Sequence, residues 1–110
     1  MNKILKLNLD ELLTSKEDDS ISGRKTGQAY LKDKKVISNL EDGYNIEIII
    51  DERINAINDS FWKGFFSGVM EKYKSKEEIL KHFQIIGDEY FIDSVDKNLM
   101  ILESIFKSEK

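Results

Sequence analysis

The stretch IEIIIDERINAINDSFWKGFFSGV, residues 46–69, decides the fold. It begins with a run of β-branched residues, Ile46 to Ile50, which ends at Asp51 and is typical of a buried strand. After a loop over residues 52–58, large apolar side chains return at helical spacing, which predicts an amphipathic helix rich in aromatic rings. These side chains are Phe61, Trp62, Phe65, Phe66, Val69, Met70 and Tyr73.

Upstream of this stretch the sequence predicts one strand and one helix. Leu5, Leu7 and Leu9 alternate with polar residues, which is the period of a half-buried strand. The acidic segment 14–22 has no apolar period and is expected to be a surface loop. From Ser22 to Gly43 the apolar period becomes helical, with Ser22 as the expected cap and Gly43 as the expected end.

Downstream, Ser75 and Glu78 form a capping-box pattern that predicts a short helix to about Lys81. Residues 83–86 are expected to form a brief strand, and residues 92–106 a long helix. Alternating strands and helices imply parallel strands with right-handed connections. The sequence therefore predicts one domain over residues 1–110, an α/β layer fold in which three to four helices pack on a short mixed or parallel sheet.

The composition is that of a soluble globular domain. Apolar residues make up 40% of the chain and charged residues 35%. No window approaches the roughly 18 to 20 consecutive apolar residues that a membrane-spanning helix needs. The N-terminal residues are not followed by the small-residue cleavage site of a signal peptide. A cytoplasmic protein is therefore expected. The absence of cysteine agrees with a reducing compartment. A net charge of −4 gives no reason to expect nucleic-acid binding.

No catalytic or metal-binding motif stands out, so we expect neither enzymatic activity nor a cofactor. His82 is the only histidine, which excludes a multi-histidine metal site. The acids between residues 88 and 96 lack the spacing of a calcium loop. The segment SGRKTG, residues 22–27, lacks the glycine that precedes lysine in a nucleotide-binding phosphate loop.

Asp59 and Ser60 stand between the predicted loop and the aromatic helix, where two interpretations remain open. Either residue can act as an N-cap, which contributes about 1 kcal/mol. Alternatively, Ser60 is a phosphoacceptor, because a phosphate at this position would face the free N–H groups of the helix start. Such a phosphate would add about −1.5 to −2 charges beside Asp51 and Asp59 and change the surface seen by a partner.

The aromatic helix and Arg24 also leave alternatives open. One helix rarely needs so many large rings for a small core, so Phe61, Trp62 and Lys63 either contribute to a partner-binding surface or belong to the core and its edge. Arg24 either pairs with the carboxylates near Asp51 or is solvated.

The chain resembles the STAS-like domain family of unknown function, a relative of the STAS domains of anti-sigma factor antagonists. The resemblance runs from about residue 5 to residue 102 and rests on SGRKTG, IEIIID and INAINDSFWKGFF. STAS antagonists carry an Asp-Ser-Ser-Gly step at the strand-to-helix junction. Asp59 and Ser60 match its first half, whereas Phe61 and Trp62 replace its second half.

This resemblance implies a regulatory protein–protein interaction module without catalysis. It implies a protein partner of the serine-kinase type, within the histidine-kinase-like ATPase superfamily, and makes Ser60 the candidate phosphoacceptor. The expected docking surface comprises Arg24, Asp51, Asp59, Ser60, Phe61, Trp62 and Lys63.

An alternative function is a small phage or mobile-element inhibitor that binds a larger complex through acidic surface mimicry. Short length, acidity and a residue bias typical of AT-rich bacterial or phage genomes motivate it. Self-association into a homodimer, through the aromatic helix or an exposed sheet edge, is compatible with the sequence but not specified by it.

Overall fold

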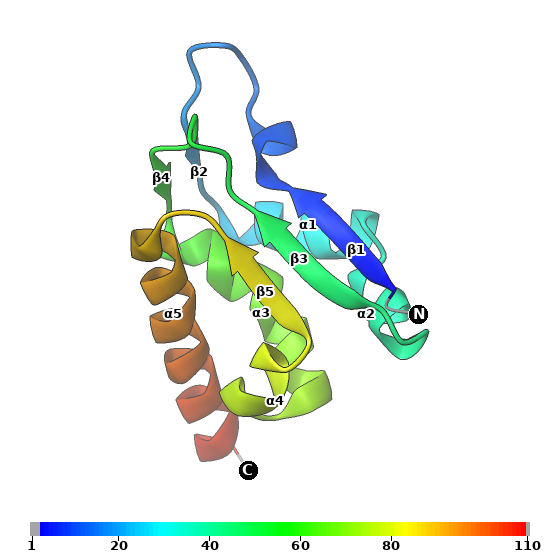
Figure 1. Ribbon diagram of the computed structural model, residues 1–110. Coiled ribbons are helices and arrows are strands. Elements are labelled where there is room, and N and C mark those ends of the chain that lie inside the picture. The colour runs from blue at the N-terminus through cyan, green and yellow to red at the C-terminus, as the bar shows by residue number, and fades with distance from the viewer. Residues whose placement is uncertain (1–2, 110) are drawn as a thin grey trace.

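The computed structural model describes residues 3–109, in which five α-helices, one 3₁₀ helix and five strands follow one another (Figure 1). The chain is a small α/β protein, as the sequence predicts. The elements are β1 (Ile4–Asn8), η1 (Leu9–Leu12), β2 (Ser20–Ile21), α1 (Arg24–Asp33), α2 (Val36–Glu41), β3 (Asn45–Ile49), β4 (Ala56–Ile57), α3 (Asp59–Tyr73), α4 (Lys76–Leu80), β5 (Phe83–Ile86) and α5 (Glu89–Ser108).

The main sheet has three parallel strands in the order β1-β3-β5. Each strand is added on the same side of its predecessor, and right-handed crossovers then place all connecting helices on one face of the sheet. Figure 1 shows α1, α2 and α3 behind the sheet and α5 along its β5 side. The result is a two-layer structure in which no described segment covers the front of the sheet.

The covered face of the sheet forms the core together with α3. Leu7 and Ile48 are neighbours in the sheet and both are 0% exposed. The ring of Phe83 in β5 contacts Phe65 and Phe66 of α3 edge to face, with centroid distances of 6.3 and 5.4 Å. The aromatic residues of α3 therefore fill the space between the two layers.

The open face of the sheet carries the alternate side chains of the same strands. Its central row contains Lys6, Glu47 and Gln84, which the register aligns across the three strands. Lys6 and Gln84 are exposed and Glu47 is half-buried. One row further along, Ile49 is half-buried and Ile86 is 39% exposed. Asn8, the register partner of Ile49, is exposed in the same row. This face is thus polar in the middle and carries two isoleucines beside an asparagine at its end.

The closest contact between helices is the crossing of α1 and α3, which depends on two glycines. A Cβ at Gly27 would lie 2.2 Å from the carbonyl oxygen of Phe61 and 2.6 Å from the amide nitrogen of Phe65. A Cβ at Gly64 would lie 2.1 Å from the carbonyl oxygen of Arg24. Because backbone atoms cannot rotate away, both helices need glycine for the main chains to approach this closely.

The helix predicted over residues 22–43 is divided into α1 and α2. Lys35 adopts a left-handed backbone conformation with φ of 54°, which interrupts the helical hydrogen bonding and adds one helix to the expected number. Ser22 does not cap α1, because Gly23 occupies the N-cap position with φ of 103°. Gly43 ends the segment with φ of 92°, as predicted.

A second sheet pairs β2 with β4, at one end of the molecule (Figure 1). Both segments lie in stretches that the sequence predicts to be loops, because strands of two residues are too short to produce a recognisable period. The amide of Asn58 donates to the carbonyl of Ile21 at 2.8 Å and extends this pairing to the start of α3.

The remaining helix starts follow ordinary capping chemistry. The Ser75 hydroxyl accepts a hydrogen bond from the amide of Glu78, which confirms the predicted start of α4. Asp88 caps α5 by accepting from the amide of Tyr90 at 3.0 Å. None of the helices within residues 3–109 combines the length and apolar character needed to cross a membrane.

Candidate functional site

The Asp59-Ser60 step lies where the sequence analysis placed it, at the start of α3, but neither residue is the N-cap. Asn58 takes that role, and its side chain accepts a hydrogen bond from the amide of Ser60 at 2.9 Å. The Ser60 hydroxyl oxygen accepts from the amide of Gly23 at 3.0 Å. Half-buried Ser60 therefore connects the turn before α1 to α3.

Asp59 connects α3 to α5. Its carboxylate accepts a hydrogen bond of 2.9 Å from the side-chain amide of Asn98, which is 2% exposed. The same amide group donates to the carbonyl of Ser94. Asp59 thus has a structural partner on its inner side, while the residue as a whole remains exposed.

Phe61 and Trp62 are both 0% exposed, which corrects their assignment to a partner-binding surface. Phe61 contacts Trp62 edge to face at 5.3 Å, and Trp62 stacks on Phe66 at 5.9 Å. These rings are core residues, because a two-layer fold with only three main strands depends on α3 to fill its interior.

Arg24, Asp51 and Lys63 are not brought together. Arg24 is exposed at the start of α1 and forms no ion pair with any described residue, so the proposed pairing with Asp51 is absent. Asp51 follows β3, where its carboxylate accepts from the amide of Arg53 at 2.9 Å. Lys63 is half-buried on α3.

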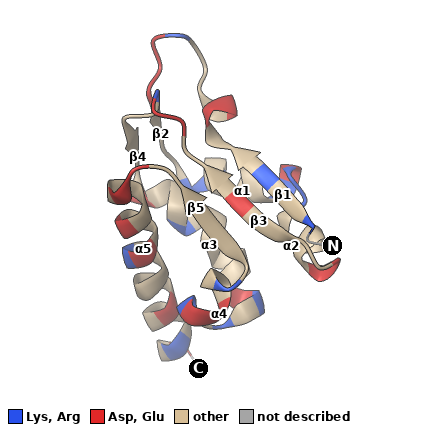
Figure 2. Cartoon of the chain, viewed as in Figure 1, with Lys and Arg blue, Asp and Glu red and all other residues tan. Residues whose placement is uncertain are grey.

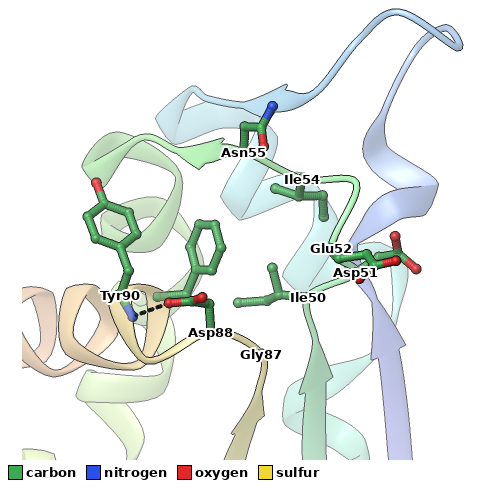
Figure 3. A pocket seen from close by; sticks show the side chains of 9 residues that line it. Ile50, Asp51, Glu52, Ile54, Asn55, Gly87, Asp88 and Tyr90 are labelled. Atoms are coloured by element: carbon green, nitrogen blue, oxygen red, sulfur yellow. Dashed lines mark hydrogen bonds between the residues drawn. The ribbon is translucent and has the colours of Figure 1, made fainter.

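A pocket of about 490 Å³ opens at the carboxyl ends of β3 and β5 (Figure 3). In parallel α/β sheets this end of the strands is the usual place for ligands. Asp51 belongs to this pocket, and the other predicted site residues do not. It is lined by Ile50, Asp51, Glu52, Ile54, Asn55, Gly87, Asp88, Tyr90 and Phe91.

The floor of the pocket is apolar and closely packed. Ile50, Ile54 and Phe91 are 6%, 2% and 6% exposed. Gly87 allows the turn from β5 to α5 to approach this floor, since a Cβ at this position would lie 3.0 Å from the Cβ of Ile50. The floor is therefore formed by residues that the core already holds in place.

The rim of the pocket is acidic. Asp51, Glu52 and Asp88 are exposed, and none of the described lining residues is lysine or arginine. Arg53 belongs to the same loop, but its guanidinium donates to the carbonyl of Ser15 in the neighbouring loop. The charge at this end of the strands is consequently negative.

Tyr90 is the most exposed large apolar side chain among the described residues, at 67%. It lies in the first turn of α5, where its ring meets that of Phe91 edge to face at 5.4 Å. Tyr90 also lines two neighbouring hollows, both of which include Asp59. The ring therefore lies at the junction of three depressions in an acidic surface.

Sequence reasoning missed Tyr90 and Asp88 as site residues. Asp88 carries a readable signal as an N-cap, but that signal indicates structure rather than binding. The buried stripe of α5 contains Phe91, Val95 and Leu99. Tyr90 lies outside this stripe, and an aromatic residue in such a position is expected to be exposed.

The pocket brings together carboxylates, one amide and one phenol. Within residues 3–109, no cluster of three or more histidine, cysteine or acidic side chains is arranged to hold a metal ion. An apolar floor with a negative rim suits an apolar or aromatic group that carries a positive charge. The fold and the pocket define the chain as a small α/β protein with one open sheet face. No family model, curated protein or solved structure matches it.

Proposed function

We propose that the protein is a non-catalytic, regulatory protein–protein interaction module of the cytoplasm, whose pocket at the carboxyl ends of β3 and β5 binds a basic segment of a partner protein. The observation that carries this proposal is the acidic rim around an apolar floor. The docking surface is thus shifted from the buried rings of α3 to the loop after β3 and the start of α5.

Charge complementarity supports a basic occupant. Asp51, Glu52 and Asp88 attract lysine or arginine, and they oppose acidic segments by like-charge repulsion. The exposed ring of Tyr90 offers a face for a guanidinium group, a contact that contributes about 0.5–1 kcal/mol at exposed sites. The apolar floor accommodates the methylene stem of such a side chain.

The resemblance to STAS-like domains provides the proposed partner class, a serine kinase of the histidine-kinase-like ATPase superfamily. In this version Ser60 is the phosphoacceptor. The hydroxyl of Ser60 is half-buried and accepts from the amide of Gly23, so a kinase has to break this hydrogen bond before transfer. Phosphorylation of Ser60 stays a prediction, tested by intact-mass analysis of the native protein beside a Ser60→Ala variant.

A second candidate function uses the same surface. A small phage or mobile-element inhibitor would present the acidic rim to a basic groove of a larger complex. The projection of Asp51 and Glu52 from a loop at the end of the sheet favours this candidate. The two functions differ in the partner, a short basic segment in the first and a groove that binds the whole rim in the second.

Titration with short fluorescent peptides tests the proposed function. An arginine- and lysine-containing peptide should bind, and peptides of equal length with glutamine or glutamate in place of the basic residues should not. The double variant Asp51→Asn, Glu52→Gln should weaken binding of the basic peptide about tenfold or more, and added salt should weaken it further. Tyr90→Ala should also weaken binding.

Two further variants control the experiment. Asp88→Asn removes charge but keeps a good N-cap, so it separates loss of charge from loss of the helix start. Glu77→Gln removes an exposed carboxylate of α4, which lies outside the pocket, and should leave binding unchanged. Equal binding of all three peptides, or of wild-type protein and the double variant, would contradict the proposed function.

A further inference from the structure

The open face of the main sheet is unusual for parallel strands. Parallel sheets are ordinarily covered on both faces, because their connecting helices lie on both sides. Here the strand order β1-β3-β5 places the connecting helices on one side, α5 lies along the β5 side, and no described segment covers the other face (Figure 1). None of the residues at the centre of this face lines the acidic pocket, and the proposed function does not use them.

Two opposite charges stand side by side at the centre of the open face. Lys6 in β1 and Glu47 in β3 are register partners. Figure 2 shows a blue segment of β1 beside a red segment of β3. Neither forms an ion pair with any described residue. A surface that places one positive and one negative charge at neighbouring positions can complement a rotated copy of itself.

We propose that the open face is the interface of a symmetric dimer formed with a second copy of this chain. A two-fold axis that runs parallel to the strands, between β1 and β3, places Lys6 of each copy opposite Glu47 of the other. The same operation forms both ion pairs at once, as an isologous interface requires. An axis along β3 would instead place Glu47 opposite Glu47, which like-charge repulsion disfavours.

The ends of the open face supply the apolar part of this interface. Ile4 is 43% exposed and lies beside a hollow of about 390 Å³, which Leu80, itself 40% exposed, also lines. The proposed axis places Ile4 of each copy above Asn45 of the other, which is part of the same hollow. At the opposite end, half-buried Ile49 of each copy lies above Asn8 of the other and loses water contact.

The size of the face determines the strength of the association. The two strands that face each other, β1 and β3, each have five residues and span roughly 5 Å between strand axes and roughly 17 Å along the strands. Such a patch is well below the ~800 Å² per partner that a standard stable interface buries. The dimer is therefore weak, exchanges with monomer, and forms as the protein concentration rises.

Sedimentation equilibrium between about 10 µM and about 1 mM, a range matched to weak interfaces, tests the dimer. The wild-type chain should shift from monomer to dimer across this range. Lys6→Glu and Glu47→Lys should each remain monomeric, because each creates two like-charge contacts. An equimolar mixture of these two variants should regain the dimer, and so should the double variant.

The mixing experiment excludes a merely structural effect, because mixing two chains cannot repair a contact within either of them. Lys32→Glu on α1 is the control charge reversal and should leave the dimer intact. The pocket variant Asp51→Asn, Glu52→Gln should also dimerise like wild type, so this test is independent of the proposed function.

A wild-type chain that stays monomeric throughout the range would overturn the dimer. Failure of the mixture to regain the dimer would overturn the two-fold arrangement. If the chain self-associates but none of these charge changes affects the association, the interface lies on another surface and the proposal is also overturned.

Discussion

The two faces of the main sheet are built from alternate residues of the same three strands, yet they differ in burial and in charge. The face toward the helices holds Leu7 and Ile48, both without exposed surface, against the aromatic rings of α3. The face toward solvent holds Lys6 and Glu47 in its centre. Strand periodicity alone produces this division. The helix-covered face therefore contributes most of the stability of the sheet, and the open face is available for association.

The largest effect is expected from a substitution that disrupts the helix layer on the inner face of the sheet. Gly27→Ala should lower the free energy of unfolding by more than about 4 kcal/mol, above the usual overpacking range, because the new methyl group meets backbone atoms at 2.2 and 2.6 Å. Urea unfolding followed by circular dichroism measures the change. If the loss of stability exceeds the stability of the wild-type protein, the variant will not be obtained as soluble folded protein.

Gly68→Ala is the matched control, in the same helix as Gly64. Its Cβ would meet only the flexible Leu31 side chain, at 3.2 Å. Alanine is also the better helix former by about 1 kcal/mol, so this variant should be neutral or more stable. Equal losses for Gly27→Ala and Gly68→Ala would contradict the close crossing of α1 and α3.

A pair of adjacent isoleucines measures the difference between the two faces directly. Ile48→Ala removes a side chain that is 0% exposed and should cost about 3 kcal/mol of unfolding free energy. Ile49→Ala removes the same atoms from the open face and should cost about 1 kcal/mol or less. Both variants lose the same strand propensity, so the difference between their urea midpoints isolates burial. Similar costs would mean that the open face is covered even in the monomer.

The smallest effect concerns the hydroxyl that ties α3 to the turn before α1. Ser60→Ala should cost about 1 kcal/mol, because the half-buried amide of Gly23 loses its acceptor. Ser67→Ala is the control in the same helix, since its hydroxyl donates only to the carbonyl of Gly64, one turn earlier. Thermal unfolding of both variants makes the measurement. A stability of Ser60→Ala equal to that of Ser67→Ala would mean that the Gly23 contact contributes nothing.

Local signals made most of the fold predictable. The alternation after Leu5, the apolar run from Ile46 and the capping box at Ser75 each correspond to an observed element, because each depends on nearest neighbours along the chain. The break at Lys35 was missed, since a lysine in the left-handed conformation leaves no mark in the apolar period. The pairing of β2 with β4 was missed because it joins segments that are distant in the sequence.

The candidate site was predictable only in part. Asp51 follows a buried strand, and the position of strand ends is a local property. Phe61 and Trp62 were ambiguous, because a helical period identifies an apolar stripe but not how much core the rest of the chain provides. Asp88 and Tyr90 reach the pocket only because β5 lies next to β3, which is a property of the sheet order.

The crossing of α1 and α3 also restricts how this protein can evolve. At positions 27 and 64 even the smallest side chain collides with the main chain of the facing helix, so neither position can accept an isolated substitution while the crossing is kept. A lineage can leave this state only by moving the two helices apart, which requires the aromatic core beneath them to change at the same time. Two unremarkable glycines would therefore be among the last residues to diverge, and their joint presence would mark distant descendants of this fold.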